Sequence, residues 1–432
     1  MKGRIYHAGL SMHESRPCGT MRAATIAQHF CRRKPRWASC CHAFKEPARE
    51  WSIRTFHGLH RIAFSPADQS FAPARQARRG RFAGGGRAVR GDRPGRRLMA
   101  VKEMLIKAGG VAAVWLVGSL GALAEFSVTS KEDRIEILDE GKVVFGWQIE
   151  PLDDPEGGEK YAASAFVHPL CTPSGFCLTE IQPDDHRHHF GVWWPWKHLA
   201  VDGKKHVTWE LQKGEGRHAA VSAEVKKRSA DEVVLQAVNR DEIAAGKGGF
   251  RTVVLERAMM RFSRRDKDVY VLDIDIEQRP AVEGVEVTRY RYSGFSWRGP
   301  GEWKAANSRM LTSGGHDRDN ANGKEARWVK LEGPRPGGTA AMLIMSAAAK
   351  AGGGAERLRV WSSEIHHGLP FVNFNPVVEE SLPMKPEQRE VARRRYRLVL
   401  ADRAISAKEA KELWEGWEAA NDGSLLPEAK GS

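Results

Sequence analysis

The sequence predicts an all-β protein, an antiparallel β-sandwich or enlarged supersandwich that ends in one α-helix. From about residue 125 to residue 400, short runs that alternate apolar and polar residues are separated by turn residues, and no helical pattern lies between them. The 432-residue chain has 41% hydrophobic and 28% charged residues, which is typical of a soluble globular protein. This composition excludes a collagen-like repeat, a small disulfide scaffold, a polytopic membrane protein and a fully disordered chain.

Residues 1–98 differ in composition from the rest of the chain. They hold 21 Lys and Arg against 5 Asp and Glu, so they account for all of the net charge of +14. Their apolar residues follow no period of 2 or 3.6, so they cannot form a face that is buried in a core. We therefore expect a disordered basic leader. A start codon assigned too early would explain its presence. The remainder of the chain carries about −2 by the same count, has no basic field, and is expected to bind no nucleic acid.

Residues 99–124 have the layout of a secretory signal peptide. Lys102 and Lys107 lie in a short charged segment that precedes an apolar run over residues 108–120. Ala122-Leu123-Ala124 then forms a cleavage site before Glu125. We therefore expect a periplasmic or secreted protein. If Met1 is the true start, the same run would act as an uncleaved anchor with its basic flank inside. No other contact with a membrane is expected.

The strands of the predicted sandwich begin after the signal. Residues 269–276 alternate throughout, with Tyr270, Leu272 and Ile274 on one face and Asp273 and Asp275 on the other. Similar runs cover residues 134–138, 143–149, 221–225, 233–238, 252–255, 285–292, 340–345, 358–361 and 396–400. Turn signals such as Asp139-Glu140-Gly141 separate them, and many short strands without intervening helices favour an antiparallel sandwich.

One helix is expected after the last strand. Ser406 and Glu409 have the spacing of a capping box, and Ala410, Leu413, Trp414 and Trp417 then recur at helical spacing. This apolar stripe is expected to pack on a sheet. The chain shows no repeat of 20–50 residues, so we predict a single domain over residues 125–420, followed by a tail over residues 421–432.

Two of the six cysteines lie in the predicted domain. Cys171 and Cys177 flank Pro173-Ser174-Gly175, which is a turn signal that brings the two flanks together. In an exported protein we expect these two residues to form a disulfide. Two free thiols or a metal pair are the alternatives.

The densest group of polar residues is a histidine-rich loop followed by tryptophans. Three histidines and two carboxylates within six residues are costly to bury unless they are paired. In an extended loop His186 and His188 share a face, and this spacing suits either a divalent metal or a general acid/base beside an orienting group. A hydrogen-bonded structural corner is the alternative. The residues concerned are Asp184, Asp185, His186, His188 and His189, with Trp193, Trp194 and Trp196 after Gly191.

Further polar groups lie later in the sequence. Residues 290–298 end an expected strand at a glycine, and they contain Tyr290, Arg291 and Arg298. Glu364 precedes His366 and His367, while Asn373 and Asn375 share a strand face with Phe371. Amide side chains can hold hydroxyl groups. Taken singly, Arg291 fits a surface residue, His366 and His367 fit a solvated loop, and Asn375 before a proline fits a turn.

Motifs of several common enzyme classes are missing from the sequence. It has no G-x-S-x-G elbow, no P-loop, no H-E-x-x-H and no G-x-G-x-x-G between a strand and a helix. Hydrolysis by a serine triad, nucleotide use and dinucleotide redox chemistry therefore have little support. No organic cofactor is expected, and a divalent metal remains open.

Several of these motifs resemble a bacterial family known as methane oxygenase PmoA, or PmoA-like. The resemblance runs from about Glu125 to Trp417. It is most specific in Asp185-His186-x-His188-His189-x-Gly191 with Trp196 and in the run of residues 290–295, and it continues through His168-Pro169-Leu170, Thr172-Pro173-Ser174-Gly175, residues 311–328, Arg359-Val360-Trp361 and residues 371–376.

The resemblance implies an exported all-β protein that is similar to galactose-mutarotase-like supersandwiches. It also implies a role in carbohydrate degradation. By analogy with such sites, His188 or His189 would act as general acid/base beside Asp185 or Glu364, Arg291 and Asn373 would hold hydroxyls, and Trp193 or Trp196 would stack on a small sugar or oligosaccharide. Isomerase, lyase and hydrolase chemistry all stay open, and so does carbohydrate binding without catalysis. No oxygenase activity is expected, because no apolar run of 18 or more residues follows the signal.

Overall fold

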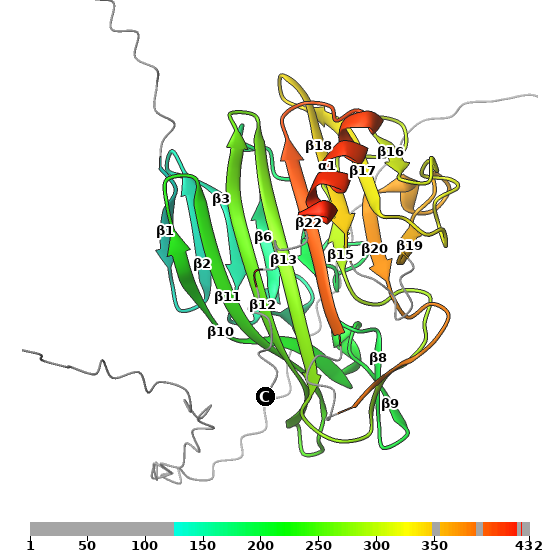
Figure 1. Ribbon diagram of the computed structural model, residues 1–432. Helices are drawn as coiled ribbons and strands as arrows, with labels where there is room; N and C mark the ends of the chain where they lie inside the picture. Colours follow the sequence, from blue (N-terminus) through cyan, green and yellow to red (C-terminus); the bar gives the residue numbers. More distant parts are fainter. Residues whose placement is uncertain (1–124, 348–354, 386–391, 421–424, 426–432) are drawn as a thin grey trace, which may run out of the picture. The chain divides into compact units, whose positions relative to one another are not determined.

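The computed structural model describes residues 125–347, 355–385, 392–420 and 425, all within one compact unit of the chain. The predicted basic leader, the signal segment and most of the C-terminal tail lie outside these residues. Within the described part, strands dominate and one α-helix follows the last strand, which confirms the predicted fold class (Figure 1).

The first large sheet has eight strands, and each strand runs antiparallel to its neighbours. The order across the sheet is β1-β2-β3-β6-β7-β15-β20-β19. Strands far apart in sequence therefore meet in its second half, where the two-residue β7 pairs with β15 and β15 pairs with β20. The strands are β1 (Ser127–Ser130), β2 (Arg134–Asp139), β3 (Lys142–Gln148), β6 (Phe166–Leu170), β7 (Val192–Trp193), β15 (Ser296–Arg298), β20 (Phe371–Asn375) and β19 (Arg357–Val360).

The second large sheet also has eight strands, in the order β10-β11-β12-β13-β22-β18-β17-β16. Its central strands are longer than the strands expected from the sequence, because the alternation of apolar and polar residues continues on both sides of the expected segments. The strands are β10 (Gly216–Arg228), β11 (Glu232–Ala244), β12 (Phe250–Asp266), β13 (Val269–Pro280), β22 (Ala392–Ala401), β18 (Gly338–Ser346), β17 (Trp328–Arg335) and β16 (Arg309–Thr312).

Smaller elements complete the fold. A four-stranded sheet has the order β21-β14-β8-β9, with β8 and β9 at the lower end of the view in Figure 1, and a hairpin pairs β4 with β5. Two 3₁₀ turns, η1 and η2, precede β10 and β20. The bounds are β21 (Leu382–Met384), β14 (Val285–Val287), β8 (His198–Val201), β9 (Lys204–Val207), β4 (Leu152–Asp154), β5 (Gly158–Ala163), η1 (Leu211–Lys213) and η2 (His366–Gly368).

The main core lies between the two large sheets. Trp147 and Val167 of the first sheet and Phe262, Leu272 and Ile344 of the second sheet belong to one cluster of fully buried side chains. Burial of such large apolar side chains contributes about 1.5–3 kcal/mol each relative to leaving them exposed. The period-two patterns therefore do what the sequence predicts: one face of each sheet fills the interior of a sandwich.

Helix α1 (Ala407–Ala419) covers the outer face of the second sheet (Figure 1). The hydroxyl of Ser406 accepts a hydrogen bond from the backbone N–H of Glu409, as the capping motif predicts. Ala410 and Trp417 pack with Val271 and Val399 in a second apolar cluster. This helix therefore covers the first part of the outer face of β13. No helix in the described ranges has the length and apolar character needed to cross a membrane.

One expected strand is shorter than the sequence suggests. The run over residues 285–292 forms a strand only over β14, and Tyr290 to Tyr292 belong to a loop. The backbone N–H of Tyr290 bonds to the carbonyl of Val377, and that of Gly294 bonds to the carbonyl of Pro195, so hydrogen bonds outside the β-sheets hold this loop.

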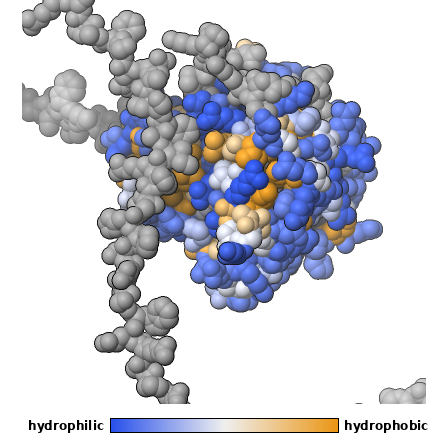
Figure 2. Space-filling view, turned by 90° about the horizontal axis from the view of Figure 1, so that it is seen from below, coloured by the Kyte–Doolittle hydropathy of each residue, from blue (hydrophilic) through white to orange (hydrophobic). Residues whose placement is uncertain are grey.

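Figure 2, which looks at the molecule from below, shows hydrophobic residues near the middle of that face with hydrophilic residues around them.

Candidate functional site

The histidine-rich loop is a tight reversal of the chain. Ile181 and Phe190 pair as an isolated bridge at its base, and the backbone N–H of Gln182 bonds to the carbonyl of His189 at 2.8 Å. Gly191 follows with a φ of +46°, and a Cβ there would collide with the carbonyl of Val167. A glycine is therefore required at this position, and it directs the chain from the loop into β7.

The loop brings its histidines against aromatic side chains on the outer face of the first sheet. We call this group the imidazole–indole cluster, and it consists of His186, His188, His189, Trp193, Trp209, Trp361, His366 and Phe371. The His189 ring lies at its base, 4.8 Å from Phe371 and 5.1 Å from Trp193 between ring centroids. The His186 ring lies 4.6 Å from His189, 4.8 Å from Trp361 and 4.7 Å from His366.

A carboxylate orients His186. The Nδ1 atom of His186 lies 2.9 Å from Asp185 Oδ2, and the same carboxylate accepts two hydrogen bonds from Arg298, at 2.9 and 2.8 Å. Arg298, which is 1% exposed, also donates to Glu180 at 3.1 Å. Because Asp185 occupies Nδ1, the Nε2 atom of His186 is the ring nitrogen left for a ligand.

A second polar group adjoins the cluster through Trp209. Trp209 contacts Trp193 at 5.6 Å and Tyr292 at 5.1 Å between ring centroids. The Tyr292 hydroxyl donates to Glu210 at 2.8 Å, and Glu210 also pairs with the ammonium of Lys197. The loop that carries Tyr290, Arg291 and Tyr292 is therefore linked to the histidine loop through Trp209.

Burial favours the neutral form of three histidines of the cluster, His188, His189 and His366, because it lowers the pKa of each. It lowers the pKa of His188 to about 4 and the pKa of His189 well below its usual value. Burial also lowers the pKa of His366, and the nearby His186 adds to this effect. Burial would raise the pKa of Asp185, but the hydrogen bonds from His186 and Arg298 outweigh it and hold the pKa well below the usual value. The site therefore combines neutral imidazoles with an ionised carboxylate at neutral pH.

Three residues expected to contact a substrate lie in the interior instead. Trp196 is fully buried, with Arg394 over its ring at 4.3 Å. The amide of Asn373 is fully buried and bonds to the backbone of Ser293 and Phe295. The amide of Asn375 bonds to the carbonyl of Tyr290 and to the N–H of Val377. Both asparagines thus hold the loop of residues 290–295 in place.

Arg298 and Glu364 also differ from their expected places. Arg298 is enclosed by Asp185 and Glu180, so it positions the carboxylate rather than facing solvent. Glu364 is exposed, and its carboxylate bonds to none of the described residues. Asp185 is therefore the carboxylate that the structure places beside a histidine of the loop.

A metal would have to compete with existing hydrogen bonds at this site. Ligand atoms of Asp185, His186 and His366 lie within 4.8 Å of one another. However, both oxygens of Asp185 already accept N–H groups, and Nδ1 of His186 is used by the same carboxylate. Nε2 of His186 and a ring nitrogen of His366 could hold a divalent cation, while His188 faces the Glu210 side of the cluster.

One cavity adjoins the cluster, and a second, larger cleft lies beside Glu180. The small cavity, of about 20 Å³, is lined by His188, Trp193, Trp209 and His218 and has room for about one water molecule. The open cleft, of about 610 Å³, is lined by Cys177, Glu180 and Glu302, and Glu180 connects it to Arg298.

The two cysteines lie opposite each other, as the turn signal predicts. Cys171 and Cys177 pair as an isolated antiparallel bridge, and both are free cysteines in this structure. The hydrogen bond from the Cys171 thiol lowers the pKa of Cys177 to about 6 and raises that of Cys171 itself. The disulfide between them stays a prediction.

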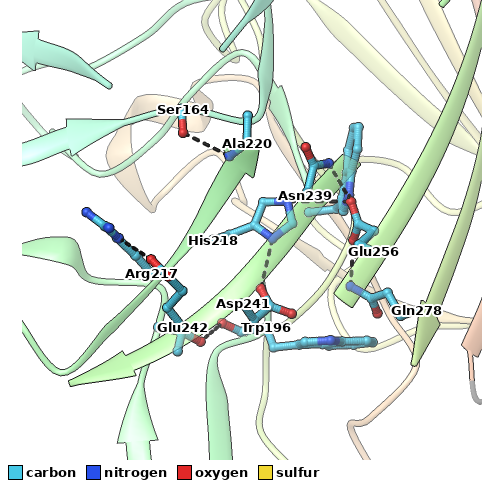
Figure 3. A network of polar contacts seen from close by, with 12 residues as sticks. Ser164, Trp196, Arg217, His218, Ala220, Asn239, Asp241, Glu242, Glu256 and Gln278 are labelled. Atoms are coloured by element: carbon cyan, nitrogen blue, oxygen red, sulfur yellow. Dashed lines mark hydrogen bonds and ion pairs between the residues drawn. The ribbon is translucent and has the colours of Figure 1, made fainter. Parts of the chain in front are cut away.

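A buried polar network lies beside the small cavity, on the inner face of the second sheet (Figure 3). His218 bonds to Asp241 at 2.8 Å, and Glu256 accepts hydrogen bonds from Trp194, Asn239 and Gln278. Burial would lower the pKa of His218, but the charges of Glu256 and Asp241 outweigh it and raise the pKa. This network ties strands β10 to β13 together underneath the cluster.

Several residues of the site escape interpretation from sequence. Trp209 and Glu210 follow β9 with no motif around them, and Lys197 follows the tryptophan run as an ordinary basic residue. Trp361 and Arg359 occur in a motif of the family resemblance, but nothing in that motif shows their contact with the histidine loop. The signal that could have found them is the aromatic residue beside a charged one, at 209–210 and at 359–361.

Comparisons with known proteins give a family. Among solved structures, a GalM/aldose epimerase homologue from C. elegans is similar to this chain, at 8% sequence identity and a TM-score of 0.30, with 64% of this chain and 98% of that chain covered. A search of curated proteins found no match. The resemblance to the PmoA-like family finds no support in these comparisons and stays a prediction. The family model described as a family of unknown function, DUF6807, matches residues 134–415, so the chain belongs to that family.

Proposed function

We propose that this protein binds a saccharide at the imidazole–indole cluster and acts on it by proton transfer through His186. The observation that carries the proposal is the geometry of His186. Its ring lies 4.8 Å from the Trp361 ring, and its Nδ1 is held by Asp185 at 2.9 Å. An imidazole with one nitrogen fixed by a carboxylate presents the other nitrogen in a defined orientation, which general acid–base catalysis requires.

The aromatic side chains support binding of a sugar ring. Trp361 and Trp209 both contact His189, with ring centroids 5.7 and 6.5 Å away. Trp361 and Trp209 are only 4% and 2% exposed, so they form the inner wall of the site. The partly exposed His186 and the exposed His366 supply hydrogen bonds to the hydroxyls of a sugar ring that packs on this wall.

The charges around His186 suit a group that first accepts a proton as a base and then donates it as an acid. When Nε2 accepts a proton from the sugar, the imidazolium forms next to the ionised Asp185, which stabilises it. Arg298 keeps this carboxylate fixed, because it is almost fully buried and bonds to both of its oxygens. Protonated His186 then returns the proton to the sugar, so no proton is gained or lost overall.

The proposal is tested by one set of proton NMR spectra in D₂O. A panel of mono- and disaccharides is incubated with the protein, and the spectra report anomeric interconversion, exchange of C–H for deuterium, elimination and glycoside hydrolysis. We expect one of these reactions with the wild type and a loss of at least about a hundredfold with His186→Gln, since a general acid–base group contributes roughly 10²–10⁴ in rate.

The chain offers a matched control in η2. His366 and His367 are adjacent, and both have a positive φ, which asparagine tolerates. Only His366 contacts the rings of His186 and Trp361 among the contacts described. His366→Asn should therefore weaken saccharide binding, and His367→Asn should leave it unchanged. Binding without turnover in the wild type would show a carbohydrate-binding protein, and neither binding nor turnover would reject the proposal.

A further inference from the structure

Two arginines at the border of the imidazole–indole cluster have no acidic partner among the described residues. We call Arg291 and Arg359 the arginine pair. The Arg291 guanidinium lies 5.9 and 5.7 Å from the rings of Tyr290 and Tyr292. Arg359 is half-buried, and its guanidinium donates to the neutral amide oxygen of Asn322 at 3.0 Å. A half-buried cation without an anion is unusual, because burial of a charge is costly unless it is paired.

The register of the first sheet places Arg359 on the face that carries the cluster. Trp193, Ser296, Asn373 and Arg359 form one row across β7, β15, β20 and β19. Trp361 lies two residues beyond Arg359, so the two side chains leave the chain on the same side. Asn373, next to Arg359 in the row, bonds to Ser293 and thereby fixes the loop of Arg291 above it.

The charge of Arg291 acts on the guanidinium of Arg359. Burial lowers the pKa of Arg359, and the positive charge of Arg291 is the next largest cause. Two carboxylates that contact the cluster are already used: Glu210 pairs with Lys197 and Tyr292, and Asp185 pairs with Arg298 and His186. Neither of them therefore compensates the charge of the arginine pair.

We propose that the arginine pair binds the anionic substituent of a saccharide, so that the substrate class of this site is an acidic sugar rather than a neutral one. This inference rests on the proposed function of the same cluster. The planar guanidinium of Arg359 can donate two parallel hydrogen bonds to a carboxylate or sulfate group. With that group on the arginine pair, the sugar ring would extend toward Trp361, two residues after Arg359, and toward His186, whose ring lies 4.8 Å from that of Trp361.

The test measures dissociation constants of paired sugars by NMR titration. D-glucuronic and D-galacturonic acid are compared with D-glucose and D-galactose, and D-glucose 6-sulfate distinguishes a sulfate from a carboxylate. We expect at least one anionic sugar to bind about tenfold or more tightly than its neutral counterpart, with the preference falling as salt is raised. The inference is overturned if neutral and acidic sugars bind equally, and that result leaves the proposed function standing. If no sugar binds, both fail.

Variants localise the effect. Arg359→Gln should lower the affinity for the preferred anionic sugar about tenfold and leave the affinity for neutral sugars unchanged, while Arg359→Lys should recover part of the loss because it retains the charge. Arg289→Gln is the matched control, since Arg289 is an exposed arginine two residues from Arg291 whose guanidinium bonds to the carbonyl of Glu379. An equal loss in Arg289→Gln and Arg359→Gln would show a general charge effect and would overturn the assignment.

Discussion

Replacing Asp185 by asparagine tests the arrangement that orients His186. The Asp185 side chain is 26% exposed and bonds to both terminal nitrogens of Arg298, which is 1% exposed. Asparagine has the same shape, but its NH₂ group would face an N–H of Arg298, and the buried guanidinium would keep only Glu180 as an anionic partner. The substitution therefore removes one charge from a largely buried ion pair.

The expected cost follows from these contacts. Removing one partner of a buried ion pair costs about 3–5 kcal/mol, and since Glu180 remains and Asp185 is partly solvated, we expect a loss of about 2 kcal/mol for Asp185→Asn. The pKa of Asp185 is held below its usual value, so its stabilising effect is present above the unfolded-state pKa of 3.8 and is lost as the pH falls through the folded-state pKa. The measurement is therefore made at pH 7.

The assay is urea unfolding of the full chain, followed by tryptophan fluorescence. Asp184→Asn is the matched control, because the Asp184 side chain is 90% exposed and bonds to Arg187 at the surface, where an ion pair contributes about 0–1 kcal/mol. Asp185→Asn should shift the unfolding midpoint several times further than Asp184→Asn. Equal shifts would refute the account of Asp185 as the partner of the buried Arg298.

Three further outcomes are expected. At a histidine the unfolded state binds a proton near pH 6.5, whereas folded His188 binds one only near pH 4. Stability should therefore fall with decreasing pH in this window, and His188 should contribute up to about 1.4 kcal/mol per pH unit beside the other histidines whose pKa is lowered. His188→Gln should reduce the slope in urea unfolding, and an unchanged slope would contradict the burial of His188. Because Asp185 is already bonded, dialysis against EDTA should leave saccharide binding unchanged, and a stoichiometric metal in elemental analysis whose removal abolishes binding would contradict this. After reduction, Cys177 should be alkylated rapidly at pH 6.5, and Cys171→Ala should slow the reaction about tenfold by mass spectrometry, since the thiolate is the reactive form; no change would mean that Cys171 does not lower the pKa of Cys177.

The sheets can be predicted from sequence where the strands are long enough to show a period. Residues 269–276 alternate, and β13 forms there with Leu272 and Ile274 in the main core. The strands that carry the site are too short for this. β7 has two residues and β15 has three, and their positions depend on partners far away in sequence, such as Ser296 opposite Asn373.

The site can be predicted only in part for a related reason. The spacing of His186, His188 and His189 identifies the loop, but Trp209 and Trp361 join it through three-dimensional contacts that no local pattern encodes. Polar residues on strands were misleading, because sequence does not distinguish a free amide from one that bonds to the backbone. Asn373 has the residue type of a ligand-binding group, yet its amide holds the loop of residues 290–295.

The most direct measurement of saccharide binding is a crystal structure of the protein soaked with the sugar that binds best in the NMR panel. The account predicts density for a sugar ring in contact with Trp361 and within hydrogen-bond distance of His186 Nε2, with any anionic group on Arg359. A sugar bound instead in the cleft beside Cys177 and Glu302, with the imidazole–indole cluster unchanged, would contradict it.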